Sequence, residues 1–110
     1  MNNCIFCKIR DGEIPKEFTY QDEDMMVFPD IEPLKPIHML IIPKKHIVDF
    51  LDLSEPILTQ KINKVIQKII KEQGLENKGY RIGVNGGGAQ AIDHLHFHLM
   101  GPIGMTVKMV

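Results

Sequence analysis

The heptapeptide His94-Leu95-His96-Phe97-His98-Leu99-Met100 decides the fold of this chain, because imidazole and apolar side chains alternate along it without interruption. Such alternation predicts a β-strand, since successive side chains of a strand point to opposite faces of a sheet. The histidines would share one face, with neighbours about 6.6 Å apart, while Leu95, Phe97 and Leu99 enter a core. Imidazole is a poor core former and an unusual choice for a solvent-facing strand. We therefore interpret the histidine face as a functional site.

Further strands are predicted upstream of this run. Candidates at 18–20 and 25–28 flank an acidic turn and form a hairpin, and 80–84 precedes the histidines. The segment 38–42 is almost entirely apolar, which is typical of a central strand. The segment 106–109 is a candidate for a further extended piece. Sequential strands with few helices favour an α+β fold with an antiparallel sheet of about five strands.

One long helix and one or two short helices are predicted as well. The long helix would start at Ser54, a good N-cap residue, and stop before Gly74, which suits a position just past a helix end. Its apolar residues recur at three- and four-residue steps, as packing on a sheet requires: Leu58, Ile62, Val65, Ile66 and Ile69. Its lysines at 61, 64, 68 and 71 form a solvated stripe. Short helices are expected at 4–10 and 46–50.

The composition indicates one globular domain over residues 1–110. With 110 residues, 44% hydrophobic and 25% charged, the chain is large enough for a conventional core. Its net charge of -1 gives no reason to expect a nucleic-acid partner. The apolar runs are too short to cross a bilayer, and the N-terminus lacks a signal-peptide pattern. We therefore expect a cytoplasmic protein with no membrane partner.

A glycine-rich segment, Asn85-Gly86-Gly87-Gly88-Ala89-Gln90, lies shortly before the histidines. Asn-Gly is typical of a hairpin turn, but a two-residue turn does not need three glycines. Consecutive residues without Cβ let backbone N–H groups approach an anion such as phosphate. We therefore favour a phosphate held beside imidazoles over a plain loop.

Imidazole suits phosphoryl chemistry, because its neutral form is a nucleophile near pH 7 and a neighbouring imidazolium donates hydrogen bonds to phosphate oxygens. His96 is flanked on both sides and is the predicted nucleophile. His98 would donate to a non-bridging oxygen, and His94 would orient the group or relay a proton. His38, at the start of the central strand, is either a fourth member of this group or a structural residue.

These features together resemble the histidine triad (HIT) family of nucleotide hydrolases and transferases. The run from His94 to Met100 matches the signature His-φ-His-φ-His-φ-φ, in which φ is apolar. Other segments resemble the small purine-nucleotide phosphoramidase branch, in the same order along the chain: Cys4-Ile5-Phe6-Cys7-Lys8-Ile9, Gly12-Glu13-Ile14-Pro15, Asp30-Ile31, Pro36-Ile37-His38, Ile42-Pro43-Lys44-Lys45-His46-Ile47 and Gly79-Tyr80-Arg81. The resemblance covers Cys4 to about Gly101 and implies a HIT-like fold.

The resemblance implies that His96 attacks the α-phosphorus of a purine nucleoside 5′-phosphoramidate, as an adenosine 5′-monophosphoramidase does, or of an acyl-nucleotide. A nucleotidyl-histidine would form, and water would resolve it. Asp30 would accept the ribose hydroxyls, Ile31 would face the base, and His38 would support the triad. The other residues assigned to substrate are Asn85, Gly88 and Gln90. The resemblance also implies a two-fold symmetric homodimer with contacts through 80–84 and the end of the long helix.

The pair Cys4 and Cys7 has the spacing of a thiolate zinc knuckle, and some relatives complete such a site with the equivalents of His46 and His94. The alternative is two small buried residues beside Phe6. Zinc at this place would be structural, and no cofactor is required for the chemistry.

Two other functions remain open from the sequence. One is a regulatory protein that binds a nucleotide and a protein partner but hydrolyses the nucleotide negligibly. Ala91 keeps this function open, because relatives often carry Ser at this position, whose hydroxyl can contact the phosphate or the leaving group. The other is a metal-dependent hydrolase that uses a His-x-His pair as zinc ligands, although the run contains no carboxylate to complete such a site.

Overall fold

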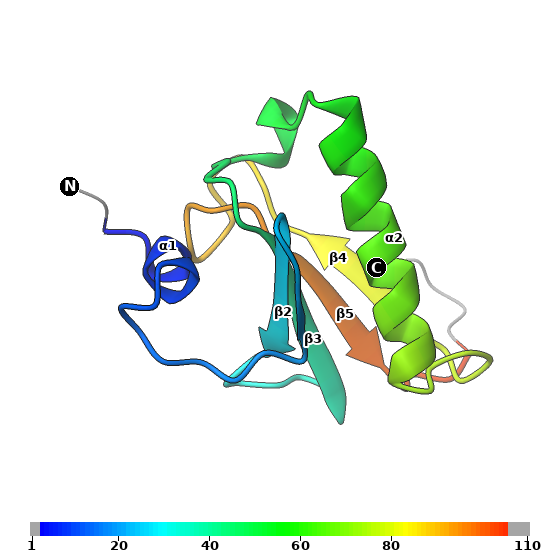
Figure 1. The fold of residues 1–110 in the computed structure, drawn as a ribbon. Coiled ribbons are helices and arrows are strands. Elements are labelled where there is room, and N and C mark those ends of the chain that lie inside the picture. The colour runs from blue at the N-terminus through cyan, green and yellow to red at the C-terminus, as the bar shows by residue number, and fades with distance from the viewer. Residues whose placement is uncertain (1–2, 106–110) are drawn as a thin grey trace.

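The computed structural model describes residues 3–105, which form an antiparallel five-stranded sheet with a helix on each face (Figure 1). The strands are β1 (Tyr20–Gln21), β2 (Met25–Pro29), β3 (Ile37–Pro43), β4 (Arg81–Val84) and β5 (Phe97–Gly101). The helices are α1 (Ile5–Arg10), the short 3₁₀ helix η1 (Phe50–Asp52) and α2 (Pro56–Glu72). The predicted α+β fold is thereby confirmed. The extended piece predicted at 106–109 lies outside the described residues.

The strands lie in the order β1-β2-β3-β5-β4, so β3 is central, as its apolar sequence predicted. β3 pairs with β2 through Val27 opposite Ile41 and with β5 through Met39 opposite Leu99. The predicted hairpin is present, with Tyr20 opposite Val27. Its first strand is β1, shorter and later than the predicted 18–20.

Alternation along the strands separates two apolar layers, one on each face of the sheet. The α2 face holds side chains of all three central strands against the helix: Met25, Val27, Met39, Ile41, Phe97 and Leu99 with Ile62, Ile66 and Ile69. The α1 face holds Phe6 and Ile9 of the helix with Met26, Phe28, Leu40 and Ile42. His98 lies opposite Leu40 in the register, so the histidine face is the α1 face.

β5 begins at Phe97, three residues later than the histidine run. The register that pairs Ile41 with Phe97 would place Leu95 opposite Pro43, and proline has no N–H to extend the ladder. Leu95 instead donates its N–H to the carbonyl of Ile47 at 2.6 Å. Leu95 nevertheless lies in the α2-side core, so the predicted alternation of faces holds beyond the regular strand.

Two predictions about helices are wrong. α2 has Glu55 rather than Ser54 as its N-cap, because Pro56 supplies the fixed φ of the first helical residue. The predicted helix at 46–50 is absent, since the Ile47 oxygen accepts the N–H of Leu95, Asp49 has an extended backbone and the 3₁₀ turn starts only at Phe50. The predicted end of the long helix is confirmed by Gly74, which has φ +69° directly after the C-cap Gln73.

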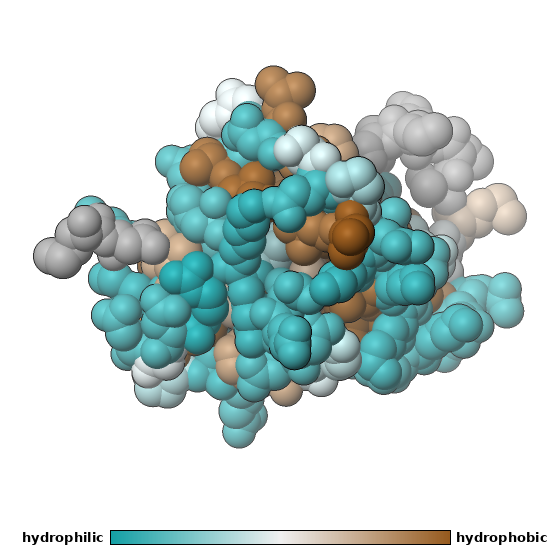
Figure 2. All heavy atoms as spheres, turned by 45° about the horizontal axis from the view of Figure 1, so that its top comes forward, coloured by the Kyte–Doolittle hydropathy of each residue, from teal (hydrophilic) through white to brown (hydrophobic). Residues whose placement is uncertain are grey.

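No helix within residues 3–105 is long and apolar enough to cross a membrane. Hydrophilic residues cover most of the face shown in Figure 2, with apolar areas between them toward its top. Four of the exposed large apolar side chains lie between the end of β3 and the first turn of α2, namely Val48, Phe50, Leu51 and Ile57.

Candidate active site

His96 lies at the entrance to β5 and is almost fully buried, at 6% exposure. Its Nδ1 lies 2.8 Å from the backbone oxygen of His94. Because a carbonyl oxygen can only accept, Nδ1 carries the proton and Nε2 retains its lone pair. The ring of Phe6 packs edge-on against His96, with centroids 5.1 Å apart. The residue predicted as nucleophile is thus held in the tautomer that nucleophilic attack through Nε2 requires.

His38 and His98 form a directed hydrogen-bond chain beside His96. The backbone N–H of Leu34 donates to His38 Nδ1 at 3.0 Å, so the proton of His38 lies on Nε2. That Nε2–H donates to His98 Nδ1 at 2.8 Å, which leaves the proton of His98 on its own Nε2. Burial, followed by the proximity of His96 and His38, lowers the pKa of His98. His98 therefore presents a neutral N–H donor, 5.0 Å from His96 between ring centroids.

Asp30 follows β2 and reaches the same group of histidines. Its Oδ2 lies 3.5 Å from His38 Nε2 and 4.0 Å from His98 Nδ1, while Oδ1 accepts the N–H of Glu32 at 2.9 Å. The next residue, Ile31, is 83% exposed. The sequence suggests that Asp30 is a turn residue, and its Oδ1 does hold a turn. The same turn directs Oδ2 of Asp30 toward the histidines.

The glycine-rich segment is held by contacts within the protein. Three successive N–H groups already have acceptors: Gly87 donates to Asp49 Oδ2 at 2.9 Å, Gly88 to Gln90 Oε1 at 3.0 Å and Ala89 to the Gly86 oxygen at 3.2 Å. The amide of buried Gln90 also donates to the Val48 oxygen at 3.1 Å. A phosphate could use these N–H groups only by replacing the present acceptors. Asn85 is exposed at the end of β4.

Sequence reasoning missed Asp49, which is 38 residues away from the glycine it binds. Its Oδ1 accepts the N–H of Leu51 at 3.2 Å, so one carboxylate caps η1 and holds the glycine-rich segment. Hydrogen bonds from Gly87 and then Leu51 lower the pKa of Asp49. The sequence offered no signal for this contact, because the helix predicted at 46–50 places Asp49 inside a helix and not at its cap.

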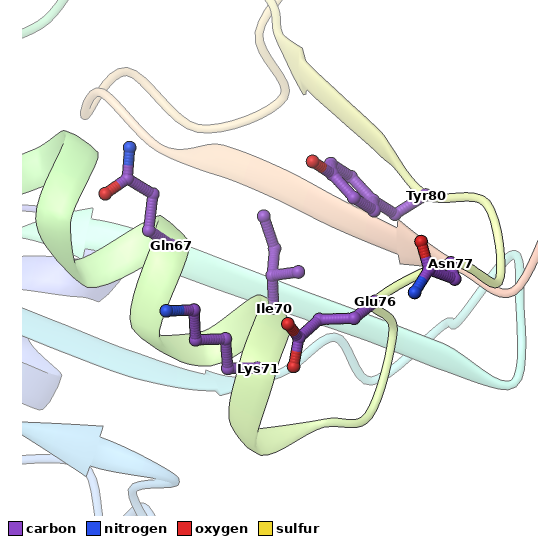
Figure 3. A pocket seen from close by; sticks show the side chains of 6 residues that line it. All are labelled: Gln67, Ile70, Lys71, Glu76, Asn77 and Tyr80. Atoms are coloured by element: carbon purple, nitrogen blue, oxygen red, sulfur yellow. The ribbon is translucent and has the colours of Figure 1, made fainter.

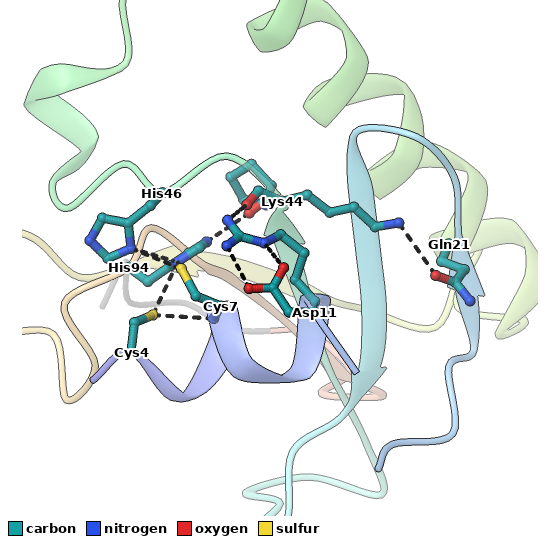
Figure 4. A network of polar contacts seen from close by, with 9 residues as sticks. Cys4, Cys7, Asp11, Gln21, Lys44, His46 and His94 are labelled. Atoms are coloured by element: carbon teal, nitrogen blue, oxygen red, sulfur yellow. Dashed lines mark hydrogen bonds and ion pairs between the residues drawn. The ribbon is translucent and has the colours of Figure 1, made fainter. Parts of the chain in front are cut away.

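A second cluster joins α1 to the start of the histidine run (Figure 4). Cys4 Sγ lies 3.3 Å from His94 Nδ1, and Cys7 Sγ lies 3.3 Å from His46 Nδ1 and 3.6 Å from His94 Nδ1. The two Nδ1 atoms of His46 and His94 are 3.1 Å apart. The four residues that were predicted to converge from three segments of the chain do so.

The protonation of His94 suits a metal ligand. Its Nε2 donates to the Pro43 carbonyl at 2.7 Å, so Nδ1 faces the cysteines with a free lone pair. Burial lowers the pKa of His94 to about 4, which keeps the ring neutral. Burial also raises the pKa of Cys4.

The spacing of the four atoms matches a tetrahedral zinc site. Zinc bonds of about 2.3 Å to sulfur and about 2.0 Å to nitrogen place sulfur and nitrogen ligands roughly 3.5 Å apart, and two nitrogens roughly 3.3 Å apart. Four of the six distances among the ligand atoms of Cys4, Cys7, His46 and His94 run from 3.1 to 3.6 Å, and all four atoms lie within 4.8 Å of one another. The donor set and the geometry therefore fit zinc.

The position of His94 corrects two interpretations. Both of its ring nitrogens have partners in this cluster or at Pro43, so the side chain is not placed to relay a proton, and only its carbonyl contacts His96. A catalytic zinc held by the pair His94 and His96 does not fit either, because the lone pair of His94 points to the cysteines. Asp30, His38 and His98 form a second group whose ligand atoms lie within 4.8 Å of one another.

The five-stranded sheet, with alternating histidines at the start of β5, defines a histidine triad protein. The family described as "Scavenger mRNA decapping enzyme C-term binding" matches residues 3–109. Protein HitA of Neisseria gonorrhoeae is 42% identical over 106 residues, which are 92% of this chain and 97% of HitA. The chain therefore belongs to the HIT family, as the sequence resemblance indicated.

Solved structures of two HIT family hydrolases are similar to the whole fold. The protein from Legionella pneumophila is 41% identical with a TM-score of 0.88, covering 96% of this chain and 97% of that one. The protein from Clostridium thermocellum is 38% identical with a TM-score of 0.91, covering 100% of this chain and 99% of that one. These neighbours support a hydrolase in general.

Proposed function

We propose that this protein hydrolyses purine nucleoside 5′-phosphoramidates, as an adenosine 5′-monophosphoramidase, or acyl-nucleotides, through a nucleotidyl-histidine on His96. The observation that carries the proposal is the hydrogen bond from His96 Nδ1 to the His94 carbonyl at 2.8 Å. It leaves Nε2 as the nucleophile and keeps a carbonyl beside the positive charge that the ring acquires when Nε2 bonds to phosphorus.

The reaction would proceed by two displacements at one phosphorus. In the first, His96 Nε2 bonds to the α-phosphorus, the phosphorus–nitrogen bond breaks, and the amine departs with a proton from solvent. In the second, water attacks the phosphorus, the bond to Nε2 breaks, and the proton that water releases replaces the one taken by the amine. With an acyl-nucleotide, a phosphorus–oxygen bond breaks and a carboxylate leaves. One water is consumed, and no other reactant is needed.

The neighbouring side chains would bind the nucleotide on either side of this phosphorus. His98 would donate its Nε2–H to a non-bridging oxygen, with His38 fixing the tautomer. Asp30 would accept the ribose hydroxyls and Ile31 would contact the purine. Gln90, with both ends of its amide bonded to backbone, would act by holding the loop that carries Gly88 and Asn85.

The test is direct detection of the intermediate. Protein mixed with an adenosine phosphoramidate and quenched with denaturant at alkaline pH should gain the mass of one nucleotidyl group on the peptide that contains His96. His96→Ala should lose both the adduct and turnover, whereas His98→Ala should form the adduct more slowly. Full turnover by His96→Ala would overturn the proposal.

We also propose a structural zinc on Cys4, Cys7, His46 and His94, which would tie α1 to the segment carrying His96. Zinc there would supply a crosslink between elements far apart in the chain and take no part in the reaction. We propose the cytoplasm as the location, because a reducing compartment keeps cysteines available for metal binding.

We further propose a two-fold homodimer through the β4 edge and α2. β4 has β5 on one side and no neighbour on the other within residues 3–105, and its edge exposes Tyr80 and Ile82. Figure 3 shows a pocket beside this edge, lined by Gln67, Ile70, Lys71, Glu76, Asn77 and Tyr80. Sedimentation of a 12.6 kDa monomer at micromolar concentration would exclude the dimer.

A regulatory protein with negligible turnover is the second candidate. The observation that favours it is the occupied state of the N–H groups of Gly87 and Gly88, which a productive phosphate site would leave available. Nucleotide binding without turnover, in protein with intact His96, would select this function.

A further inference from the structure

The region around His98 has two sides, because β5 lies between β3 and β4. On the β3 side, His38 and Asp30 approach His98. On the β4 side, the residue opposite His98 is Gly83, and a Cβ there would meet no atom within 4 Å. If the nucleoside lies over Asp30, a group leaving the phosphorus on the far side departs toward β4 and the glycine-rich segment that follows it.

Asp49 lies on that β4 side. It comes two residues after Ile47, whose oxygen accepts the N–H of Leu95 at 2.6 Å, directly beside the nucleophile in sequence. Its carboxylate binds the N–H of Gly87 and packs on Gly86, where a Cβ would lie 2.7 Å from Oδ1. Asp49 forms no ion pair with any residue between 3 and 105. An uncompensated negative charge therefore occupies the loop that an anion would otherwise use.

We propose that Asp49 makes this site select leaving groups by charge, favouring amines that carry a second, cationic ammonium group over neutral ones, and disfavouring anionic ones such as carboxylates or phosphates. The proposal rests on the proposed hydrolysis of nucleotide conjugates. The charged end of the leaving group would lie close enough to the Asp49 carboxylate to interact with its charge, and it would not contact His96. If the two unit charges lie about 8 Å apart in a partly solvated site, their interaction changes kcat/KM by about three- to tenfold.

Three substrates with the same phosphorus–nitrogen bond isolate the charge. They are adenosine 5′-phosphoramidates of 1,3-diaminopropane, butylamine and β-alanine, whose far ends are an ammonium, a methyl and a carboxylate. Native protein should rank kcat/KM in that order, with about three- to tenfold between neighbours. The ratio of the first to the last should shrink as salt rises from about 50 to about 500 mM, because partly exposed charges are screened.

Asp49→Asn keeps an acceptor oxygen for Gly87 and removes the charge, so the three substrates should become nearly equal and insensitive to salt. Asp49→Glu should restore the order. Asp52→Asn makes the same change in net charge on the neighbouring exposed position of η1 and should keep the native ranking. A purely structural role for Asp49 would alter all three rates by the same factor.

The proposal is overturned if native protein does not rank the three substrates by charge, or if Asp49→Asn keeps the native ranking. Absence of turnover on all three substrates would overturn the proposed function instead. The charge order would then be read from the dissociation constants of the three phosphoramidates, measured by calorimetry on native protein, Asp49→Asn and Asp52→Asn. Equal dissociation constants, or no binding by native protein, would overturn the role of Asp49.

Discussion

His94 and His96 are two residues apart on the same run, yet the clusters around them use imidazole in opposite ways. In the cysteine–histidine cluster, both ring nitrogens of His94 have partners. In the triad, backbone and neighbouring histidines occupy Nδ1 of His96 and of His98 and leave the Nε2 atoms for a substrate. The difference teaches that a shared strand face does not make histidines equivalent. The number of satisfied nitrogens decides which ring can react.

The largest expected effect comes from removing His96, the proposed nucleophile. His96→Ala should reduce kcat/KM for an adenosine phosphoramidate by at least about a thousandfold, because covalent catalysis divides one difficult displacement into two easier ones. His94→Gln should cost much less activity, since its side chain lies in the other cluster. Steady-state kinetics of both variants would make the comparison, and equal losses would contradict it.

Acid should lower the free energy of unfolding through His94, which belongs to the cysteine–histidine cluster. Its folded-state pKa of about 4 lies below the ordinary value of 6.5, so the unfolded chain takes up the proton first as pH falls. In metal-free protein this contribution to the free energy of unfolding is complete above about pH 6.5 and is lost between there and about pH 4, amounting to up to about 3 kcal/mol.

Urea denaturation of chelator-treated protein at several pH values in this window, with NMR titration of the imidazoles, measures that loss. The pKa of His98 is also lowered and acts in the same direction. Unchanged stability across the window, or a His94 that titrates near 6.5, would contradict the prediction.

Removal of metal should act on the cysteine–histidine cluster alone. If zinc at about a hundredfold above its dissociation constant stabilises the folded state, chelation lowers the free energy of unfolding by about 2.7 kcal/mol. Phosphoramidase activity should largely persist, because His96 and His98 lie outside the proposed zinc site. Cys7→Ala is the matched variant and should become insensitive to chelators. Less than about a tenth of an equivalent of zinc by elemental analysis, with no melting shift on zinc addition, would remove the site.

The smallest effect on kcat/KM is expected from substitution of His38, and it tests whether this residue acts only through His98. His38→Phe removes the donor to His98 Nδ1, so His98 loses its fixed tautomer. The loss of one such hydrogen bond corresponds to about a tenfold decrease in kcat/KM, with the nucleotidyl adduct on His96 still formed. A loss as large as that of His96→Ala would mean that His38 has a direct part in the reaction.

Much of the fold was predictable because it rests on local patterns. The alternation at 94–100 placed Leu95, Phe97 and Leu99 in the core, and the apolar sequence of 38–42 identified the central strand. The start of β5 was not predictable, because it depends on Leu95 falling opposite Pro43 in a register that only the folded sheet defines.

The candidate site was predictable as a set of residues but not as a set of contacts. Cys4, Cys7, His46 and His94 converge as the resemblance implied. The tautomers of His38, His96 and His98 depend on backbone atoms of Leu34 and His94, which no side-chain pattern reveals. Asp49 binds Gly87 across 38 residues of sequence that include α2 and β4, and neither residue type at its position indicates the other.

The alternation along β5 also bears on how such a chain can change over generations. Odd-numbered positions of the run face α2, and their substitution disturbs the packing that every copy of the protein needs. Even-numbered positions and the loops beside them face the other way, where they meet a different set of neighbours. A substitution at an even-numbered position can therefore change the site without disturbing the packing against α2, so the two faces of one short strand can be varied separately.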